Sequence, residues 1–255
     1  MQAIAIKGGF ALETKLKNSL GEVPGLYLLP EFFAAKTCET ITRQSLKLFH
    51  KLEQATPEAH GQNVSIPQPE LIKSENHNLP SEEKFLRLEI DDDQDRKLSC
   101  EYFPTYGERG HALGYFRGNR NLPSFISEGC LPRIRNLVEQ YQLANREGNL
   151  IWRLTANFYK STPAGVAGFP FHVDIPANGI VTMILNIQRE ATFQIAKENT
   201  LHELRLPVGA LLILSGESRY EWQHRVLPEH SLTPNNSDDA SSGTVKRVSL
   251  VLGFK

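Results

Sequence analysis

The nine residues from 151 to 159, Ile-Trp-Arg-Leu-Thr-Ala-Asn-Phe-Tyr, begin a change in the sequence pattern. From here the chain consists of short runs rich in β-branched, aromatic and aliphatic residues, at 151–159, 179–187, 191–196, 201–206, 210–214 and 245–254. Such runs, separated by turn-forming residues, are typical of β-strands. Their close spacing predicts an antiparallel sandwich or barrel in the carboxy-terminal half of the chain.

The amino-terminal half has fewer signals of regular structure. A short buried strand is expected at 24–30, followed by an amphipathic helix with apolar residues at helical spacing, namely Cys38, Ile41, Leu48, Phe49 and Leu52. A second helix is expected to cover a sheet with Ile134, Leu137, Val138 and Tyr141. Residues 54–96, which end in Asp91-Asp92-Asp93, are expected to form loops with few regular elements, and residues 232–244 a mobile loop.

Composition limits the class of protein. With 255 residues, 40% of them hydrophobic and 22% charged, the chain has the make-up of a globular protein with a buried core. No run approaches the roughly 18 apolar residues of a membrane span, so we expect a soluble, cytoplasmic protein without a membrane partner. The cysteines form no Cys-x-x-Cys pair, which argues against a disulfide framework and a thiolate zinc site. The formal net charge of -1 provides no global attraction to nucleic acid but permits a local basic patch.

Three residues in the carboxy-terminal half form a candidate metal site. His172 and Asp174 are two positions apart, so in an extended segment both side chains leave the same face. His224 lies beyond the run at 210–214, where a neighbouring strand can supply a third ligand. Two imidazoles and one carboxylate make the facial triad of non-haem iron oxygenases, whereas zinc favours a tetrahedral set. The alternative is that His-x-Asp occurs by accident and that His224 is an ordinary structural histidine.

Four segments together resemble the AlkB family of oxygenases. They are Asn157-Phe158-Tyr159, Phe171-His172-Val173-Asp174, the stretch from Leu211 to Tyr220 that leads to His224, and Arg247-Val248-Ser249-Leu250. Their order and spacing match the family over residues 150–255, with a weaker likeness at 24–33. The resemblance implies a mainly β protein with flanking helices, whose core at 150–255 is a double-stranded β-helix, or jelly-roll. It further implies that residues 1–149 form an α/β extension and substrate lid packed on this core, in one catalytic domain.

The resemblance also implies the cofactors, which are Fe(II), 2-oxoglutarate and O2. The implied metal ligands are His172, Asp174 and His224. The positions that match those contacting 2-oxoglutarate in the family are Asn157, Tyr159, Arg247 and Ser249. Arg247 suits the distal carboxylate, because a planar guanidinium donates two parallel hydrogen bonds to a carboxylate. Three alternatives stay open: a strand-end turn role for Asn157, a core role for Tyr159, and an internal ion pair for Arg247.

Two positions depart from the family pattern. Family members often have a second arginine six residues after the first, where this chain has Gly253, so co-substrate binding is expected to be weaker or differently organised. The founding DNA-repair members have an acidic residue two positions after the iron aspartate, where this chain has Pro176. Because that acidic residue reads an exocyclic amine of the base, Pro176 argues against recognition of a methylated base in the same manner.

The sequence says less about the substrate than about the metal. Residues 102–120 interleave aromatic and basic side chains, which suits either a lid that stacks on nucleic-acid bases or a pair of half-buried strands. Arg219 and Tyr220 either line the mouth of the site or fix the turn before His224. The candidate substrate residues are therefore Tyr106, Tyr115, Arg117, Arg120, Arg219 and Tyr220.

The family resemblance implies an Fe(II)- and 2-oxoglutarate-dependent dioxygenase that hydroxylates an N-methyl or related carbon of an alkylated DNA or RNA. The hydroxylated group would then leave as formaldehyde, and the co-substrate as succinate and carbon dioxide. The same chemistry on a methylated protein or a small molecule is an alternative. A protein of another class, a catalytically silent binding module that keeps the jelly-roll and its metal, is a further alternative.

Overall fold

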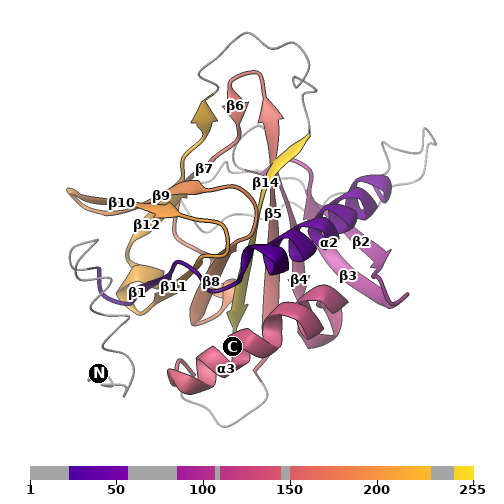
Figure 1. The fold of residues 1–255 in the computed structure, drawn as a ribbon, viewed down its shortest axis with the longest axis horizontal. Helices are drawn as coiled ribbons and strands as arrows, with labels where there is room; N and C mark the ends of the chain where they lie inside the picture. Colours follow the sequence, from indigo (N-terminus) through magenta and orange to yellow (C-terminus); the bar gives the residue numbers. More distant parts are fainter. Residues whose placement is uncertain (1–22, 57–84, 107–109, 145–149, 231–243) are drawn as a thin grey trace.

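The structure, a computed structural model, describes residues 23–56, 85–106, 110–144, 150–230 and 244–255. In these residues two antiparallel sheets form a jelly-roll, and the two longer helices, α2 and α3, cover the larger sheet (Figure 1). The larger sheet has the strand order β1-β11-β8-β14-β5-β4-β3-β2, and the smaller one β10-β9-β12-β7. The short strands β6 and β13 pair with each other beside β5. The fold is therefore mainly β with flanking helices, as the sequence predicts.

The bounds of the elements follow the chain order. The strands are β1 (Leu26–Leu29), β2 (Leu86–Asp91), β3 (Lys97–Phe103), β4 (His111–Arg117), β5 (Trp152–Thr162), β6 (Gly165–Val166), β7 (Phe169–His172), β8 (Val181–Asn186), β9 (Ala191–Lys197), β10 (Thr200–Leu206), β11 (Leu211–Ser215), β12 (Gln223–Val226), β13 (Glu229–His230) and β14 (Val245–Phe254). The helices are α2 (Ala35–Gln54), α3 (Leu131–Gln140) and α4 (Glu217–Tyr220), with 3-10 turns at Asn119–Asn121 and Pro176–Asn178 and a π-helical turn at Phe125–Cys130.

One face of the larger sheet forms the main core with the helices. Alternate residues of β5 and β14 point to this face, and cross-strand pairs such as Leu250 with Ala156 are fully buried. Helices α2 and α3 cover these strands with the apolar residues Ile41, Leu48, Phe49, Leu52, Ile134 and Leu137. The two amphipathic helices that the apolar spacing predicts are thereby confirmed.

The other face of the larger sheet lies toward the smaller sheet. Ile184 of β8 and Leu212 of β11 belong to a second apolar core with Phe193 and Ile195 of β9. On β5 and β14 the same face becomes polar, and its buried residues include Asn157, Arg247 and Ser249. Since buried polar groups require partners, this face is where a ligand site is expected.

The larger sheet extends further toward the amino terminus than the sequence pattern indicates. Residues 86–91 form β2, which pairs along its whole length with β3, so the expectation of loops with few regular elements at 54–96 is wrong here. Residues 57–84 of that range lie outside the described residues. In β2 the apolar residues Leu86, Leu88 and Ile90 alternate with charged residues that face solvent. Because of these charges, the composition of the strand resembles that of a loop.

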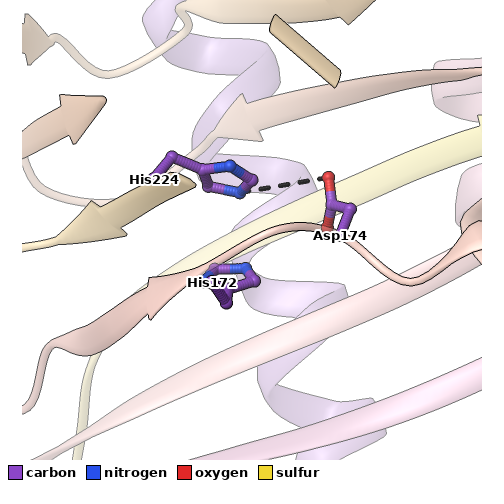
Figure 2. A group of neighbouring side chains, drawn as sticks. All are labelled: His172, Asp174 and His224. Atoms are coloured by element: carbon purple, nitrogen blue, oxygen red, sulfur yellow. Dashed lines mark ion pairs between the residues drawn. The ribbon is translucent and has the colours of Figure 1, made fainter. Parts of the chain in front are cut away.

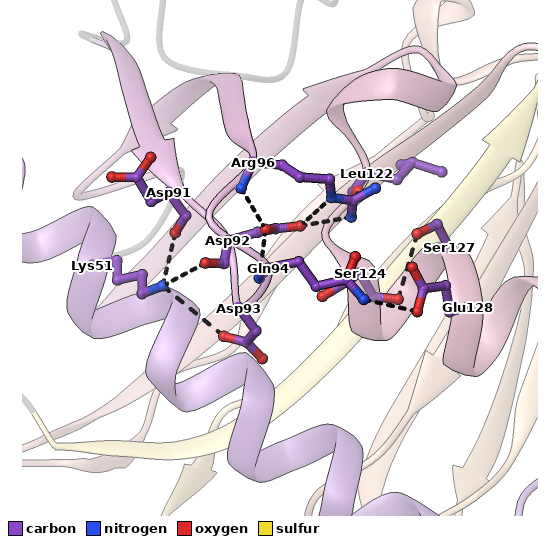
Figure 3. A network of polar contacts seen from close by, with 10 residues as sticks. All are labelled: Lys51, Asp91, Asp92, Asp93, Gln94, Arg96, Leu122, Ser124, Ser127 and Glu128. Atoms are coloured by element: carbon purple, nitrogen blue, oxygen red, sulfur yellow. Dashed lines mark hydrogen bonds and ion pairs between the residues drawn. The ribbon is translucent and has the colours of Figure 1, made fainter.

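Asp92 closes the β2–β3 hairpin (Figure 3). The residue is 5% exposed, and its carboxylate accepts hydrogen bonds from the backbone N–H groups of Gln94 and Arg96, at 2.8 and 3.0 Å. The Arg96 guanidinium also binds this carboxylate, with Nε at 2.8 Å. Lys51 of α2 donates to the backbone carbonyls of Asp91 and Asp92 at 2.8 and 3.2 Å. The aspartate run is therefore a structured turn that joins the hairpin to α2.

The remaining predictions of regular structure agree with the observed strands. The six β-rich runs correspond to β5, β8, β9, β10, β11 and β14, and the strand expected at 24–30 corresponds to β1. Of residues 102–120, the strand interpretation is confirmed at 102–103 and 111–117, since β4 pairs with both β3 and β5. The mobile loop expected at 232–244 lies outside the described residues except for Thr244. No described helix has both the length and the apolar character needed to cross a membrane.

Candidate active site

The candidate metal ligands come from two paired strands of the smaller sheet and from the turn after one of them. His172 is the last residue of β7 and lies opposite His224 of β12, with ring centroids 4.3 Å apart. Asp174 follows two residues later, and its Oδ2 lies 3.9 Å from Nε2 of His224 (Figure 2). One ligand atom from each residue lies within 4.8 Å of the other two. The structure thus brings together the three residues that the sequence pattern selects.

All three side chains have the charge state that a divalent cation requires. Burial, followed by the neighbouring His172, lowers the pKa of His224 to about 3. Burial also lowers the pKa of His172. Burial by itself would raise the pKa of the Asp174 carboxyl, but the two histidines and the guanidinium of Arg219 outweigh it and lower this pKa below its usual value. At neutral pH the site therefore presents two neutral imidazoles and one carboxylate, so that a metal need not displace protons to bind.

Hydrogen bonds from outside the trio orient the ligands. Nδ1 of His172 donates to the carbonyl oxygen of Pro170 at 2.9 Å, which leaves the Nε2 lone pair for a metal. The Thr182 hydroxyl donates to Oδ2 of Asp174 at 2.9 Å. Nδ1 of His224 is buried and has no hydrogen-bond partner among the described residues. The three side chains therefore offer a metal two imidazole nitrogens and a carboxylate oxygen. This is the ligand set that non-haem Fe(II) takes.

Arg247 is a buried cation on β14. It is 2% exposed, donates to the carbonyl oxygen of Ala167 at 3.1 Å, and lies 3.8 Å from the ring centre of Tyr159. Its Nε is buried without a hydrogen-bond partner, and no aspartate or glutamate of the described ranges forms an ion pair with it. The internal ion pair is therefore not found there. Since a buried charge without a paired carboxylate is costly, Arg247 is a candidate binding site for an anion.

The other residues matched to 2-oxoglutarate lie on the same face. Tyr159 is directly opposite Arg247, and Asn157 is opposite Ser249, so that all four side chains point between the two sheets. Each of the four is at most 7% exposed. Asn157 lies within β5 rather than at its end, which excludes the strand-end turn alternative. Contact with 2-oxoglutarate stays a prediction for these residues.

His111 of β4 belongs to this cluster, although no motif in the sequence selects it. It is fully buried and stacks on Tyr159, with ring centroids 4.7 Å apart. Its Nε2 lies 3.1 Å from the side-chain amide of Asn157, and its Nδ1 lies 3.0 Å from the carbonyl oxygen of Tyr106. In the sequence, the one sign of a functional role for His111 is its position in a segment rich in aromatic and basic residues, 102–120. The pairing of β4 with β5, which brings it to the site, is a contact between distant parts of the chain.

Three candidate substrate residues lie in β4 or in the segment before it. Tyr106 stacks on Phe169 at 5.5 Å, and Phe169 contacts the His172 ring at 4.3 Å, so Tyr106 lies close to the metal ligands. Tyr115 is buried in a small apolar cluster with Phe85, Phe103 and Leu113. Arg117 is exposed and binds Glu101 at 2.8 Å.

The other three candidates lie on short helical segments. Arg120 is exposed in the 3-10 turn after β4. Arg219 is 1% exposed and donates to the backbone carbonyls of Asp174 and Ile175, so it fixes a turn rather than lining the mouth of the site. Tyr220 is 49% exposed. A direct role in substrate binding stays a prediction for all six candidates except Arg219, whose hydrogen bonds go to the backbone.

Known proteins include one with a similar sequence and others with a similar fold. No family model matches the chain. It is 26% identical over 191 residues to tRNA (carboxymethyluridine(34)-5-O)-methyltransferase alkbh8 of Xenopus tropicalis, and the match covers 71% of this chain but only 28% of that protein. A prolyl-4-hydroxylase from Pseudomonas putida superimposes with a TM-score of 0.51 and 11% identity over 96% of this chain and 97% of that one. The structure of OsALKBH1 gives a TM-score of 0.46 and 16% identity, covering 92% and 99% of the two chains.

The chain resembles AlkB-like proteins in sequence. Its likeness to the hydroxylase supports the jelly-roll fold, and the match to alkbh8 agrees with the motifs that the sequence shares with the AlkB family. The match covers only 28% of the length of that relative, so the activity of that whole protein does not transfer with the similarity.

The structure gives a reason for the glycine at the position where AlkB-family members often have a second arginine. A Cβ at Gly253 would lie 1.8 Å from the carbonyl oxygen of Asn178, so a side chain does not fit unless the turn after Asp174 moves. Arg153 is the cross-strand partner of Gly253 and donates to the carbonyl oxygen of Ala177. A guanidinium therefore reaches this side of the site from β5 instead of β14.

Proposed function

We propose that this chain is an Fe(II)- and 2-oxoglutarate-dependent dioxygenase that oxidises an alkyl group on a nucleic acid. The observation that carries the proposal is the buried Arg247, which has no carboxylate partner among the described residues and lies on the sheet face that bounds the His-Asp-His group. A site for a metal and a site for a dicarboxylate in one interior are the two requirements of this chemistry.

Each residue of the pocket has a distinct proposed role. His172, Asp174 and His224 would hold the metal. Fe(II), when bound there, would supply the activation of O2, whose reduction takes two electrons from 2-oxoglutarate as it becomes succinate and carbon dioxide and two from the C–H bond of the substrate. Arg247 binds the distal carboxylate, and the Tyr159 ring beside it excludes water from the guanidinium. The protein thus positions the metal and the co-substrate and excludes water from the guanidinium of Arg247.

The choice of a nucleic acid as substrate rests on similarity. The resemblance to the AlkB family and the curated relative, a tRNA methyltransferase by its name, both favour it. The formal net charge of -1 and Pro176 argue for a mode of recognition that differs from that of the DNA-repair members. A methylated protein or small molecule is the alternative substrate class.

The decisive experiment is an anaerobic titration of the Fe(II) protein with 2-oxoglutarate. A chelated keto acid on Fe(II) is expected to give a visible charge-transfer band, because an open face of the metal accepts both of its oxygens. Asp174→Ala should lose the band, while Asp91→Ala, which removes an exposed aspartate in β2, should keep it. Wild-type protein that binds zinc tetrahedrally and never shows the band would refute the proposed chemistry. Succinate formation with alkylated DNA, RNA and peptide then identifies the substrate class.

A further inference from the structure

The turn that follows Asp174 is anchored by a buried arginine. Arg219 of α4 is 1% exposed. Its Nη1 donates to the carbonyl oxygen of Asp174 at 2.7 Å. Its Nη2 donates to the carbonyl oxygens of Ile175 and Gly179, at 2.7 and 3.2 Å. One guanidinium therefore joins both ends of the turn 174–179 and contacts the backbone of the metal-ligand residue itself.

Asp174 needs such an anchor because the sheet does not fix it. β7 ends at His172, so the cross-strand pairing that positions the two histidines stops before the carboxylate. The side chain has its own contacts, from Thr182 to Oδ2 at 2.9 Å and from Asn178 to Oδ1 at 3.3 Å. Asn178 belongs to the same turn, however, and can orient the carboxylate only if the turn is itself fixed.

We propose that Arg219 is a positioning residue for the metal carboxylate. By binding the carbonyl oxygen of Asp174 it sets the place of that residue's Cα, and thereby the point that the short side chain reaches. It touches neither metal nor substrate. The inference rests on the proposed function only through the metal, and it requires neither 2-oxoglutarate nor turnover.

Charge and geometry predict opposite effects of removing Arg219. A buried guanidinium beside the site repels a cation, so loss of the charge alone would tighten metal binding. Loss of the carbonyl contacts would instead free the turn and weaken metal binding, as is typical when a group that orients a ligand is removed. The sign of the change in metal affinity therefore tells the two effects apart.

The experiment compares Arg219→Lys and Arg219→Gln with the wild type. Lysine keeps the charge but cannot span the two ends of the turn, and glutamine removes the charge as well. The matched control is Arg225→Gln, because Arg225 follows His224 in β12 but points to the opposite face, where its Nε donates to Gln194 at 2.7 Å. Fe(II) affinity is measured by anaerobic calorimetry without 2-oxoglutarate, and the visible spectrum of the Co(II) form reports the ligand geometry.

Both Arg219 variants are expected to bind Fe(II) about 10- to 100-fold more weakly and to give an altered Co(II) spectrum, while the control matches the wild type. Equal or tighter Fe(II) binding by folded variants would overturn the proposal. Failure of both variants to fold, measured by circular dichroism, would overturn it too, since Arg219 would then serve the whole structure. If the wild type binds Fe(II) but never gives the 2-oxoglutarate band, the proposed function is wrong and the role of Arg219 still stands or falls on these affinities.

Discussion

At the scale of single residues, two hydrogen-bond partners, Tyr106 and Asn157, determine which ring nitrogen of His111 has the hydrogen. Burial lowers its pKa to about 4, so at neutral pH only one ring nitrogen has a hydrogen. Nδ1 donates that hydrogen to the carbonyl oxygen of Tyr106, which leaves Nε2 as an acceptor. The Asn157 atom placed 3.1 Å from Nε2 is Oδ1. Because the nitrogen and oxygen of an amide are assigned from their partners, an accepting Nε2 requires the amide to be turned so that its NH2 group donates there. The buried histidine therefore sets the orientation of a residue that is predicted to bind 2-oxoglutarate.

The lowered pKa of His111 predicts a dependence of stability on pH. The unfolded chain takes up a proton near pH 6.5, whereas the folded chain resists it until about pH 4. The free energy of unfolding should therefore fall as the pH drops from about 6.5 to about 4. His111→Gln, which keeps a donor and an acceptor, should remove this contribution. Urea unfolding followed by tryptophan fluorescence at several pH values checks it, and parallel curves for the two proteins would contradict it.

Arg247 predicts a difference between binding of the co-substrate and binding of the metal. Arg247→Lys keeps the charge but loses the planar pair of donors, so 2-oxoglutarate should bind more weakly by roughly 1.5–3 kcal/mol. Fe(II) affinity should barely change, because Arg247 contacts none of the three metal ligands in the structure. The control is Arg205→Lys, an exposed arginine of β10 that pairs with Glu190. Equal 2-oxoglutarate affinities for mutant and wild type would assign the carboxylate to another cation.

At the scale of elements, the β2–β3 hairpin depends on Asp92. Burial would raise the pKa of this carboxyl, but the hydrogen bonds from Arg96 and Gln94 lower it. Asp92→Asn should reduce the free energy of unfolding at neutral pH by about 1–2 kcal/mol, since it removes a charged acceptor. A carboxyl with a lowered pKa stabilises the fold above its unfolded pKa, so the difference should shrink as the pH falls below about 3.9. Thermal unfolding of the variant and the wild type at several pH values measures this difference. The control is Asp93→Asn, a change of the neighbouring exposed aspartate.

The same elements show what a sequence can and cannot predict. Six strands are predictable from their runs of β-forming residues, namely β5, β8, β9, β10, β11 and β14. Strand β2 is not, because charges fill every second position. Arg247 stood out as a cation in an apolar strand, and the spacing of His172 and Asp174 pointed to one metal. The roles of His111 and Arg219 were not predictable, because each depends on contacts between segments far apart in the chain.

At the scale of the whole molecule, the face of the larger sheet that bounds the site extends from β8 and β14 through β5 to the amino-terminal strand β4. Thr182, whose hydroxyl binds Asp174, pairs with Gly253, which pairs with Arg153, which pairs with Arg117. Neighbouring strands are about 4.8 Å apart, so Arg117 lies roughly 14 Å from Thr182 along this row. Its side chain is exposed, on the face that bounds the metal site. We propose this surface as the place along which a substrate longer than a single residue extends.

We therefore predict that Arg117 and Arg120 contribute to substrate binding and not to the chemistry. The double variant Arg117→Ala, Arg120→Ala should form succinate at the wild-type rate without substrate, because the metal ligands and Arg247 are untouched. Its substrate-stimulated turnover should be reduced. The matched control removes two exposed arginines, Arg43 of α2 and Arg135 of α3, from the helical side of the sheet.

The dependence of this effect on salt distinguishes the substrate classes. A nucleic acid releases bound counterions for each phosphate that a cation contacts, so log K should fall with log[salt] by roughly 0.7 to 0.9 per contact. Loss of Arg117 and Arg120 should make that slope shallower by up to two contacts, while the control pair on the helices should leave it as in the wild type. A protein or a small molecule has no such row of phosphates, and its binding should depend only weakly on salt. A flat response for the wild type, together with succinate formed on a methylated peptide, would replace the nucleic acid with a protein substrate and leave the proposed oxygenase chemistry unchanged.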